Sequence, residues 1–145
     1  MDLYAENILD HYRHPRNKFP LLRRGKGQAE GAEIISHEET NLSCGDSLEI
    51  DLTISDRRIA AIGWNGDGCA ISQAAMSMLS EEIVGKTPEE VQSLKKENVY
   101  ELLGVPVGPR RFKCALLGLH TLINAVRKSK NEPAQGWAET AGESL

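Results

Sequence analysis

The spacing of the apolar residues changes once along this chain, and this change restricts the fold more than any other feature of the sequence. Over residues 47–55, apolar side chains alternate with polar ones, which is typical of a half-buried strand. Asp56 and Arg57 then predict a turn into a second strand over 58–64, so the two strands should form an antiparallel hairpin. Beyond this hairpin, apolar residues recur at helical spacing. Strands followed by helices predict an α+β fold.

Terminators and caps predict the other elements. Pro15 ends an N-terminal helix that Asp2 could cap, and Gly85 and Gly104 end two later helices. The sequence also predicts a loop over 16–31, a strand over 32–37, and helices over about 71–83, 87–95, 99–103 and 110–129. Residues 1–129 are expected to form one domain. The final segment, 130–145, lacks periodicity and is predicted to be a flexible tail.

The charge balance argues against two classes of partner. Lys and Arg number 17 against 21 Asp and Glu, a net charge of −4, whereas nucleic acids and anionic membranes attract positive surfaces. The apolar runs are far shorter than the ~20 residues that span a bilayer, and the N-terminus lacks the apolar core of a signal peptide. A cytoplasmic location is expected, where the three cysteines stay reduced and available to metals or to chemistry.

Each of the three cysteines lies in a turn or near the start of a predicted helix. Cys44 precedes the long strand, Cys69 lies where a glycine-bearing loop enters a helix, and Cys114 is near the start of the last helix. A helix N-terminus stabilises a thiolate, and Lys113 adds positive charge beside Cys114, as do the arginines at 110 and 111. The alternative is that these thiols are simply small buried hydrophobes.

Asp46 follows Cys44 by two residues. In an extended segment such residues point to the same side, so a thiolate and a carboxylate there could reach one metal ion. Gly45 between them allows a tight backbone approach. The alternative is that Asp46 only shapes a turn, as Asp beside Gly often does.

Two other patterns carry little weight. The segment NGDGC has the first two glycines of a dinucleotide-binding motif but lacks the third. His120 lies about 240° around the helix from Cys114, so it should face away from that thiol. His11 and His14 are expected at the surface and His37 in a strand, and none of them is expected to be a ligand.

Three segments, NLSCGD, GDGCAISQAAMSML and RRFKCALLGLHTL, together resemble the IscU/SufU/NifU family of iron–sulfur cluster scaffold proteins. The likeness covers residues 2–129. It implies a three-stranded antiparallel sheet with helices packed on one face. It also implies that Cys44, Asp46, Cys69 and Cys114 meet at one end of the domain and hold a transient [2Fe–2S] cluster or Zn²⁺. The implied partners are a cysteine desulfurase that donates persulfide sulfur, and apo acceptors or downstream scaffold proteins.

The resemblance leaves two functions open. A scaffold would hold a labile cluster without turnover of its own, whereas a SufU-like, zinc-bound sulfurtransferase would relay persulfide sulfur. Lys113 stands where IscU-type members carry His, which favours the sulfurtransferase, while the interval between Cys69 and Cys114 lacks the insertion usual in SufU-type members. A purely structural zinc site is disfavoured, because such sites prefer Cys and His to Asp.

Roles for two site residues follow from their charge. Cys114 has the densest cationic surroundings of the three cysteines and is predicted to be a principal persulfide acceptor. Protonated lysine has no lone pair for a metal. Lys113 is therefore expected to be auxiliary, pairing with Asp46 or a nearby thiolate when metal is absent.

Overall fold

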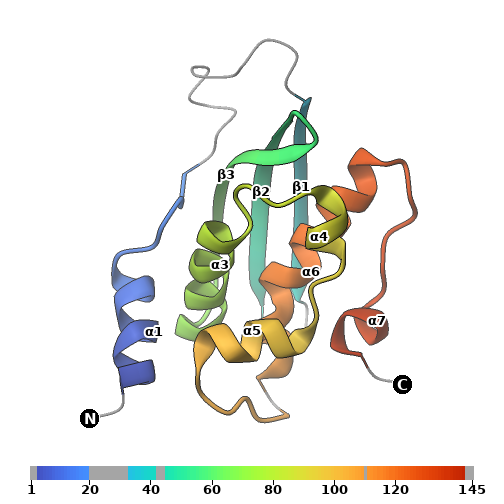
Figure 1. Cartoon of the computed structure of the whole chain (residues 1–145). Helices are drawn as coiled ribbons and strands as arrows, with labels where there is room; N and C mark the ends of the chain where they lie inside the picture. Colours follow the sequence, from blue (N-terminus) through green and yellow to red (C-terminus); the bar gives the residue numbers. More distant parts are fainter. Residues whose placement is uncertain (1–2, 20–32, 42–44, 110, 143–145) are drawn as a thin grey trace.

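A computed structural model of the chain describes residues 3–19, 33–41, 45–109 and 111–142 (Figure 1). Its elements, in chain order, are α1 (Leu3–Arg13), β1 (Glu33–Asn41), β2 (Asp46–Ser55), β3 (Arg58–Asp67), α3 (Ala70–Glu82), α4 (Pro88–Gln92), α5 (Lys96–Leu103), α6 (Phe112–Ser129) and α7 (Trp137–Ala141). The order of strands before most of the helices confirms the α+β prediction.

The three strands form one antiparallel sheet in the order β1-β2-β3. Asp56 and Arg57 join β2 to β3 with φ values of 51° and 64°, and paired positive φ values match the twist of a two-residue hairpin. Both outer strands are longer than predicted, because β2 continues to pair with them beyond their apolar residues. Asn41 lies opposite Asp46, and Asp67 opposite Ser47.

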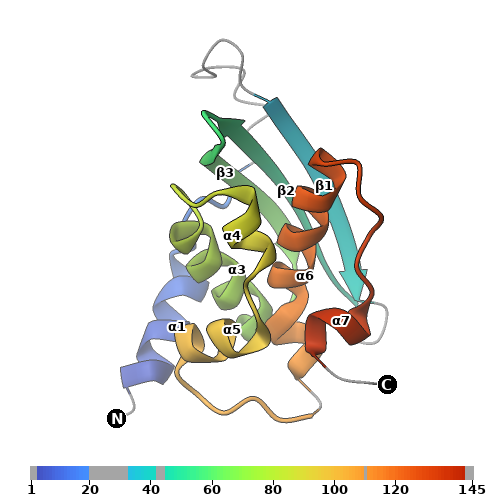
Figure 2. The same cartoon turned by 45° about the vertical axis from the view of Figure 1, so that its right-hand side comes forward.

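Helices cover one face of the sheet, with α3 and α6 lying against it (Figure 2). Leu48, Ile50 and Leu52 of β2 point into this interface and are at most 1% exposed, while Glu49 between them is exposed. Burying the apolar side of an alternating strand under amphipathic helices is the main stabilising contribution to such a fold. None of the helices in these ranges is both long and apolar enough to cross a membrane.

The predicted helix ends are mostly confirmed. Thr87 and Glu90 form a reciprocal capping box at the start of α4, where the Glu90 N–H donates to Thr87 Oγ1 at 3.1 Å. Gly104 ends α5 in the left-handed conformation, with a φ of 69°. Helix α4 stops at Gln92, three residues before the predicted end.

His11 is buried, so its predicted surface position is wrong. It lies 2.7 Å from Ser77 Oγ of α3, and the backbone N–H of Arg16 donates to the same oxygen at 2.8 Å. The carbonyl of Arg16 in turn accepts from Trp64 Nε1 at 2.7 Å. These bonds fasten α1 and the segment after it to α3 and β3. His14 is exposed, as predicted.

The prediction of a tail without regular structure is wrong for residues 137–141, which form helix α7 against α6 (Figure 2). Thr140 and Ala141 are buried. A helix of about one turn is too short to show helical periodicity. The spacing of apolar residues in this segment therefore does not predict a helix. Thr140 of α7 shares a hydrogen bond with His120, and Gln135, just before α7, donates to Asn124, so both contacts join this segment to α6.

Candidate metal centre

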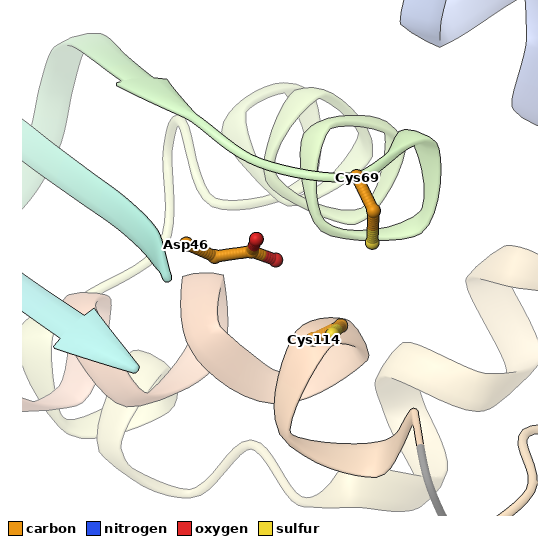
Figure 3. Close-up of side chains that lie close together, drawn as sticks. All are labelled: Asp46, Cys69 and Cys114. Atoms are coloured by element: carbon orange, nitrogen blue, oxygen red, sulfur yellow. The ribbon is translucent and has the colours of Figure 1, made fainter. Parts of the chain in front are cut away.

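Asp46, Cys69 and Cys114 come together at one end of the sheet (Figure 3). One carboxylate oxygen and the two Sγ atoms all lie within 4.8 Å of one another. Each residue lies at the start of an element: Asp46 is the first residue of β2, Cys69 caps α3, and Cys114 lies in the first turn of α6. Three segments far apart in sequence therefore supply one compact donor group.

Asp46 is buried, with 5% of its surface exposed, and its Oδ2 has no hydrogen-bond partner among the residues the structure describes. Gly45, with a φ of 77°, turns the chain into β2 just before it. A buried carboxylate oxygen without a partner costs free energy, and a bound cation would offset that cost. The carboxylate is therefore better suited to a metal than to a turn.

Cys69 is the N-cap residue of α3, with extended backbone angles, and its side chain makes no capping hydrogen bond. The side chain is half-buried. The exposed backbone N–H groups and the positive end of the helix dipole favour a negative charge at this position. Cys69 is thus placed to present its sulfur atom as a donor at the start of α3.

Cys114 is the third residue of α6 and is 7% exposed. Neither it nor Cys69 forms a disulfide. Two sulfur donors and a carboxylate match the ligands that Zn²⁺ takes in proteins, and thiolates also hold iron–sulfur clusters. The donor set therefore fits both groups named from the sequence.

Two predicted site residues need separate comment. Cys44 lies outside the described residues, so its role as a ligand stays a prediction. Lys113 is half-buried beside Cys114, and no ion pair joins it to Asp46 in the described ranges. The predicted pairing of Lys113 with Asp46 is therefore not observed among these residues, and the alternative pairing with a nearby thiolate stays a prediction.

His120 lies apart from the three donors, as its helical position predicts. Its Nε2 is 3.8 Å from Glu39 Oε1, and Glu39 Oε2 is 2.7 Å from His37 Nε2 and accepts from Asn124 Nδ2 at 3.1 Å. Burial lowers the pKa of His120, with Glu39 opposing this and His37 reinforcing it. This polar cluster was not predicted from the sequence. Residues 37 and 39 lie on one face of a strand, and residues 120 and 124 lie on one face of a helix, so the spacing within each pair was an available signal.

The chain is an α+β domain in which thiol and carboxylate donors at the starts of a strand and two helices form a group that could hold a metal ion. Residues 3–135 match the family model described as the NifU-like N terminal domain. The chain belongs to this family. Its likeness to the IscU/SufU/NifU proteins, inferred from three motifs, is thereby confirmed.

Several known proteins are similar to this chain over most of their length. It is 30% identical to the iron–sulfur cluster assembly scaffold protein IscU of Streptococcus pyogenes, over 89% of this chain and 86% of that protein. It is 29% identical to the zinc-dependent sulfurtransferase SufU of Bacillus subtilis, over 88% and 92%. A solved structure of a putative scaffold protein for the SUF system from Fervidobacterium islandicum matches with a TM-score of 0.62 at 30% identity, covering 83% of this chain and 94% of that one.

Proposed function

We propose that this chain is an iron–sulfur cluster assembly scaffold. The observation that carries the proposal is the meeting of Asp46, Cys69 and Cys114 within 4.8 Å at the starts of three separate elements. Cys44, two residues before Asp46, would complete a set of three thiolates and one carboxylate. The assembled cargo would be a [2Fe–2S] cluster. The similarity to named scaffold proteins along most of the chain supports this function.

The mixed donor set suits a protein that must release its cluster. Stable [2Fe–2S] proteins commonly hold the cluster with four cysteine thiolates. The Asp46 carboxylate is a harder, weaker ligand for this iron than a thiolate, so the bond to it breaks more readily. Cys69 is only half-buried, so an acceptor protein would reach the cluster at this residue.

We infer that sulfur reaches this site from the persulfide of a cysteine desulfurase. The Cys114 thiolate would attack the terminal sulfur of that persulfide, forming a sulfur–sulfur bond on Cys114. The bond within the donor persulfide breaks, and its cysteine leaves as a thiolate, so no external oxidant or reductant is needed. Cys114 is only 7% exposed, so docking of the desulfurase would have to open the site at the start of α6.

The second candidate function is a zinc-dependent sulfurtransferase that passes sulfur onward. The position of Lys113 beside Cys114, where IscU-type members carry His, favours it, as does the similarity to SufU. In this case the donors would hold Zn²⁺, which keeps the thiols deprotonated. In both cases the partners would be a desulfurase and an acceptor. The compartment would be the cytoplasm, where thiols stay reduced.

Anaerobic purification followed by iron, zinc and acid-labile sulfide analysis tests the two functions. Iron with a matching amount of sulfide is the result expected for a scaffold when the desulfurase, cysteine, Fe²⁺ and a thiol reductant are supplied, the reductant and Fe²⁺ giving the electrons that convert persulfide sulfur into sulfide. One zinc per chain without sulfide, even after this supply, would support the sulfurtransferase instead. The matched control is Cys69→Ser/Cys114→Ser, which should hold neither. Wild-type protein that binds no metal under either condition would contradict both functions.

A further inference from the structure

We propose that Gly68 is a positioning residue whose missing side chain sets the location of the Asp46 carboxylate. Gly68 immediately precedes Cys69, in the link between β3 and α3, and is half-buried. This inference rests on the proposed role of Asp46 as a ligand. It assigns a function to a residue that supplies no donor atom itself.

A side chain at residue 68 would occupy the space of the carboxylate. A Cβ atom built on Gly68 would lie 2.9 Å from Asp46 Cγ and 3.1 Å from Asp46 Oδ2. Cβ atoms do not approach other heavy atoms this closely without displacing them. The Asp46 carboxylate therefore lies where a side chain at residue 68 would begin.

The backbone at this position does not itself require glycine. Gly68 is absent from the residues with positive φ, whereas Gly45, which immediately precedes Asp46 in the sequence, has a φ of 77°. A Cβ on Gly45 would meet nothing within 4 Å. Gly45, next to Asp46 in the sequence, therefore allows the turn into β2. Gly68, next to Asp46 in space, leaves room for the Asp46 side chain.

Ser72 limits how the structure could adapt to a larger residue. It is fully buried, and its Oγ donates a hydrogen bond of 3.0 Å to the Cys69 carbonyl. A Cβ on Gly68 would overlap this Oγ as well. Rotation of the Ser72 side chain would relieve only its own overlap, because Asp46 Cγ would still lie 2.9 Å from the new Cβ. An alanine at 68 would therefore push the carboxylate away from the sulfur atoms.

Titration of the apoprotein with Co²⁺ tests this inference without any measurement of activity. In a site with thiolate ligands, Co²⁺ has two kinds of absorption band. The thiolate-to-metal charge-transfer bands report the sulfur donors, whereas the ligand-field bands depend on the whole donor set and therefore also on the carboxylate. Gly68→Ala should keep the thiolate-to-metal charge-transfer bands but shift the ligand-field bands to those of Asp46→Ala. Its affinity for Co²⁺ should fall about 10–100-fold, as when the outer support of a ligand is lost. Gly108→Ala is the matched control, because a Cβ there meets nothing within 4 Å and its φ is not positive.

Combined variants separate the carboxylate from a general disturbance of the fold. Gly68→Ala added to Asp46→Ala should shift the ligand-field bands no further, since the displaced group is already gone. The double variant Gly68→Ala/Ser72→Ala lacks the Ser72 Oγ that the new Cβ would overlap. Its free energy of unfolding should therefore be no lower than that of Ser72→Ala alone. Its Co²⁺ spectrum should still resemble that of Asp46→Ala.

A wild-type spectrum and affinity in Gly68→Ala, when Asp46→Ala differs from wild type, would overturn the positioning role and leave Asp46 as a ligand. A wild-type spectrum in Asp46→Ala itself would overturn the ligand role and the inference with it. Recovery of the wild-type spectrum in Gly68→Ala/Ser72→Ala would assign the effect to Ser72 and also overturn the inference.

Discussion

The indole of Trp137 stacks on the imidazole of His120, with ring centroids 4.1 Å apart and planes inclined by 15°. His120 Nδ1 and Thr140 Oγ1 also share a hydrogen bond of 2.7 Å. The backbone N–H of Gln135 donates to Asn124 Oδ1 at 2.7 Å. Side chains of α6 thus hold α7 and the segment before it, so the C-terminal part of the described chain belongs to the folded domain.

Replacing Trp137 with Ala should lower the free energy of unfolding by about 2–3 kcal/mol, because it removes a stacked and partly buried ring. Urea unfolding followed by circular dichroism measures this change. Glu139→Ala, at an exposed position of the same helix, is the control and should stay within about 0.5 kcal/mol of wild type. If Trp137→Ala is as stable as that control, α7 contributes nothing to the fold.

Stability should fall as the pH drops below about 6.5, the ordinary pKa of histidine. Burial lowers the pKa of both His11 and His120 in the folded protein. In this pH range the unfolded chain therefore binds more protons than the folded one, which favours unfolding. The contribution is fully present above pH 6.5 and is lost as pH falls towards the lowered pKa values. Each histidine can add a slope of up to about 1.4 kcal/mol per pH unit.

Thermal or urea unfolding between pH 5 and 8 checks this pH dependence. His120→Gln and His11→Gln should each reduce the slope below pH 6.5, whatever their effect on stability at pH 8. His14→Gln, on the surface of α1, serves as the control. An unchanged slope in the double variant His11→Gln/His120→Gln would show that other groups cause the pH dependence.

Changing any one of Cys44, Cys69 and Cys114 to Ser should weaken Zn²⁺ binding by more than about 100-fold, because loss of a direct ligand exceeds the 10–100-fold effect of its support. A serine hydroxyl is not deprotonated at neutral pH and is a poor ligand. Competition with a chromophoric chelator measures the affinities. If Cys44→Ser is the one variant of the three that keeps wild-type affinity, Cys44 is not a ligand. The donors would then be Asp46, Cys69 and Cys114.

Asp46→Ala should still accept a cluster but pass it to an acceptor protein more slowly. The three thiolates would remain, whereas the weakest bond, the one that opens first, would be missing. Transfer to an apo-ferredoxin, followed by its visible circular dichroism, gives the rate. Asp51→Ala, on the same strand but outside the site, is the comparison. Equal transfer rates for wild type and Asp46→Ala would contradict a role in release.

Lys113→Ala should change the free energy of unfolding by less than about 1 kcal/mol but slow the transfer of sulfur to Cys114. Among the described residues, no ion pair joins Lys113 to a carboxylate, so little folding energy depends on it. Its positive charge would instead attract the incoming persulfide. Mass spectrometry of Cys114 after timed incubation with a desulfurase and cysteine measures the rate. Lys113→Arg should retain most of it. Sulfur appearing on Cys69 first would reassign the acceptor.

Much of the fold follows from short segments of sequence. The alternation over 47–55, the Asp56–Arg57 turn and the Thr87 capping box all specify local backbone geometry, and the structure confirms each of them. The three motifs also identify the family and point to Cys69, Cys114 and Asp46 as one group, because those residues keep characteristic neighbours along the chain.

Only the tertiary structure decides between alternatives that the local sequence leaves equal. Asp46 beside a glycine could shape a turn or bind a metal, and its burial next to two sulfur atoms favours the metal. His11 and the segment 137–141 give no local sign of burial, yet each is held by a residue more than ten positions away, Ser77 for His11 and His120 for Thr140. The sequence by itself determines where helices and strands form, since their periodicity is a local property. Which side chains meet depends on contacts between distant segments, and those contacts form only when the whole core is assembled.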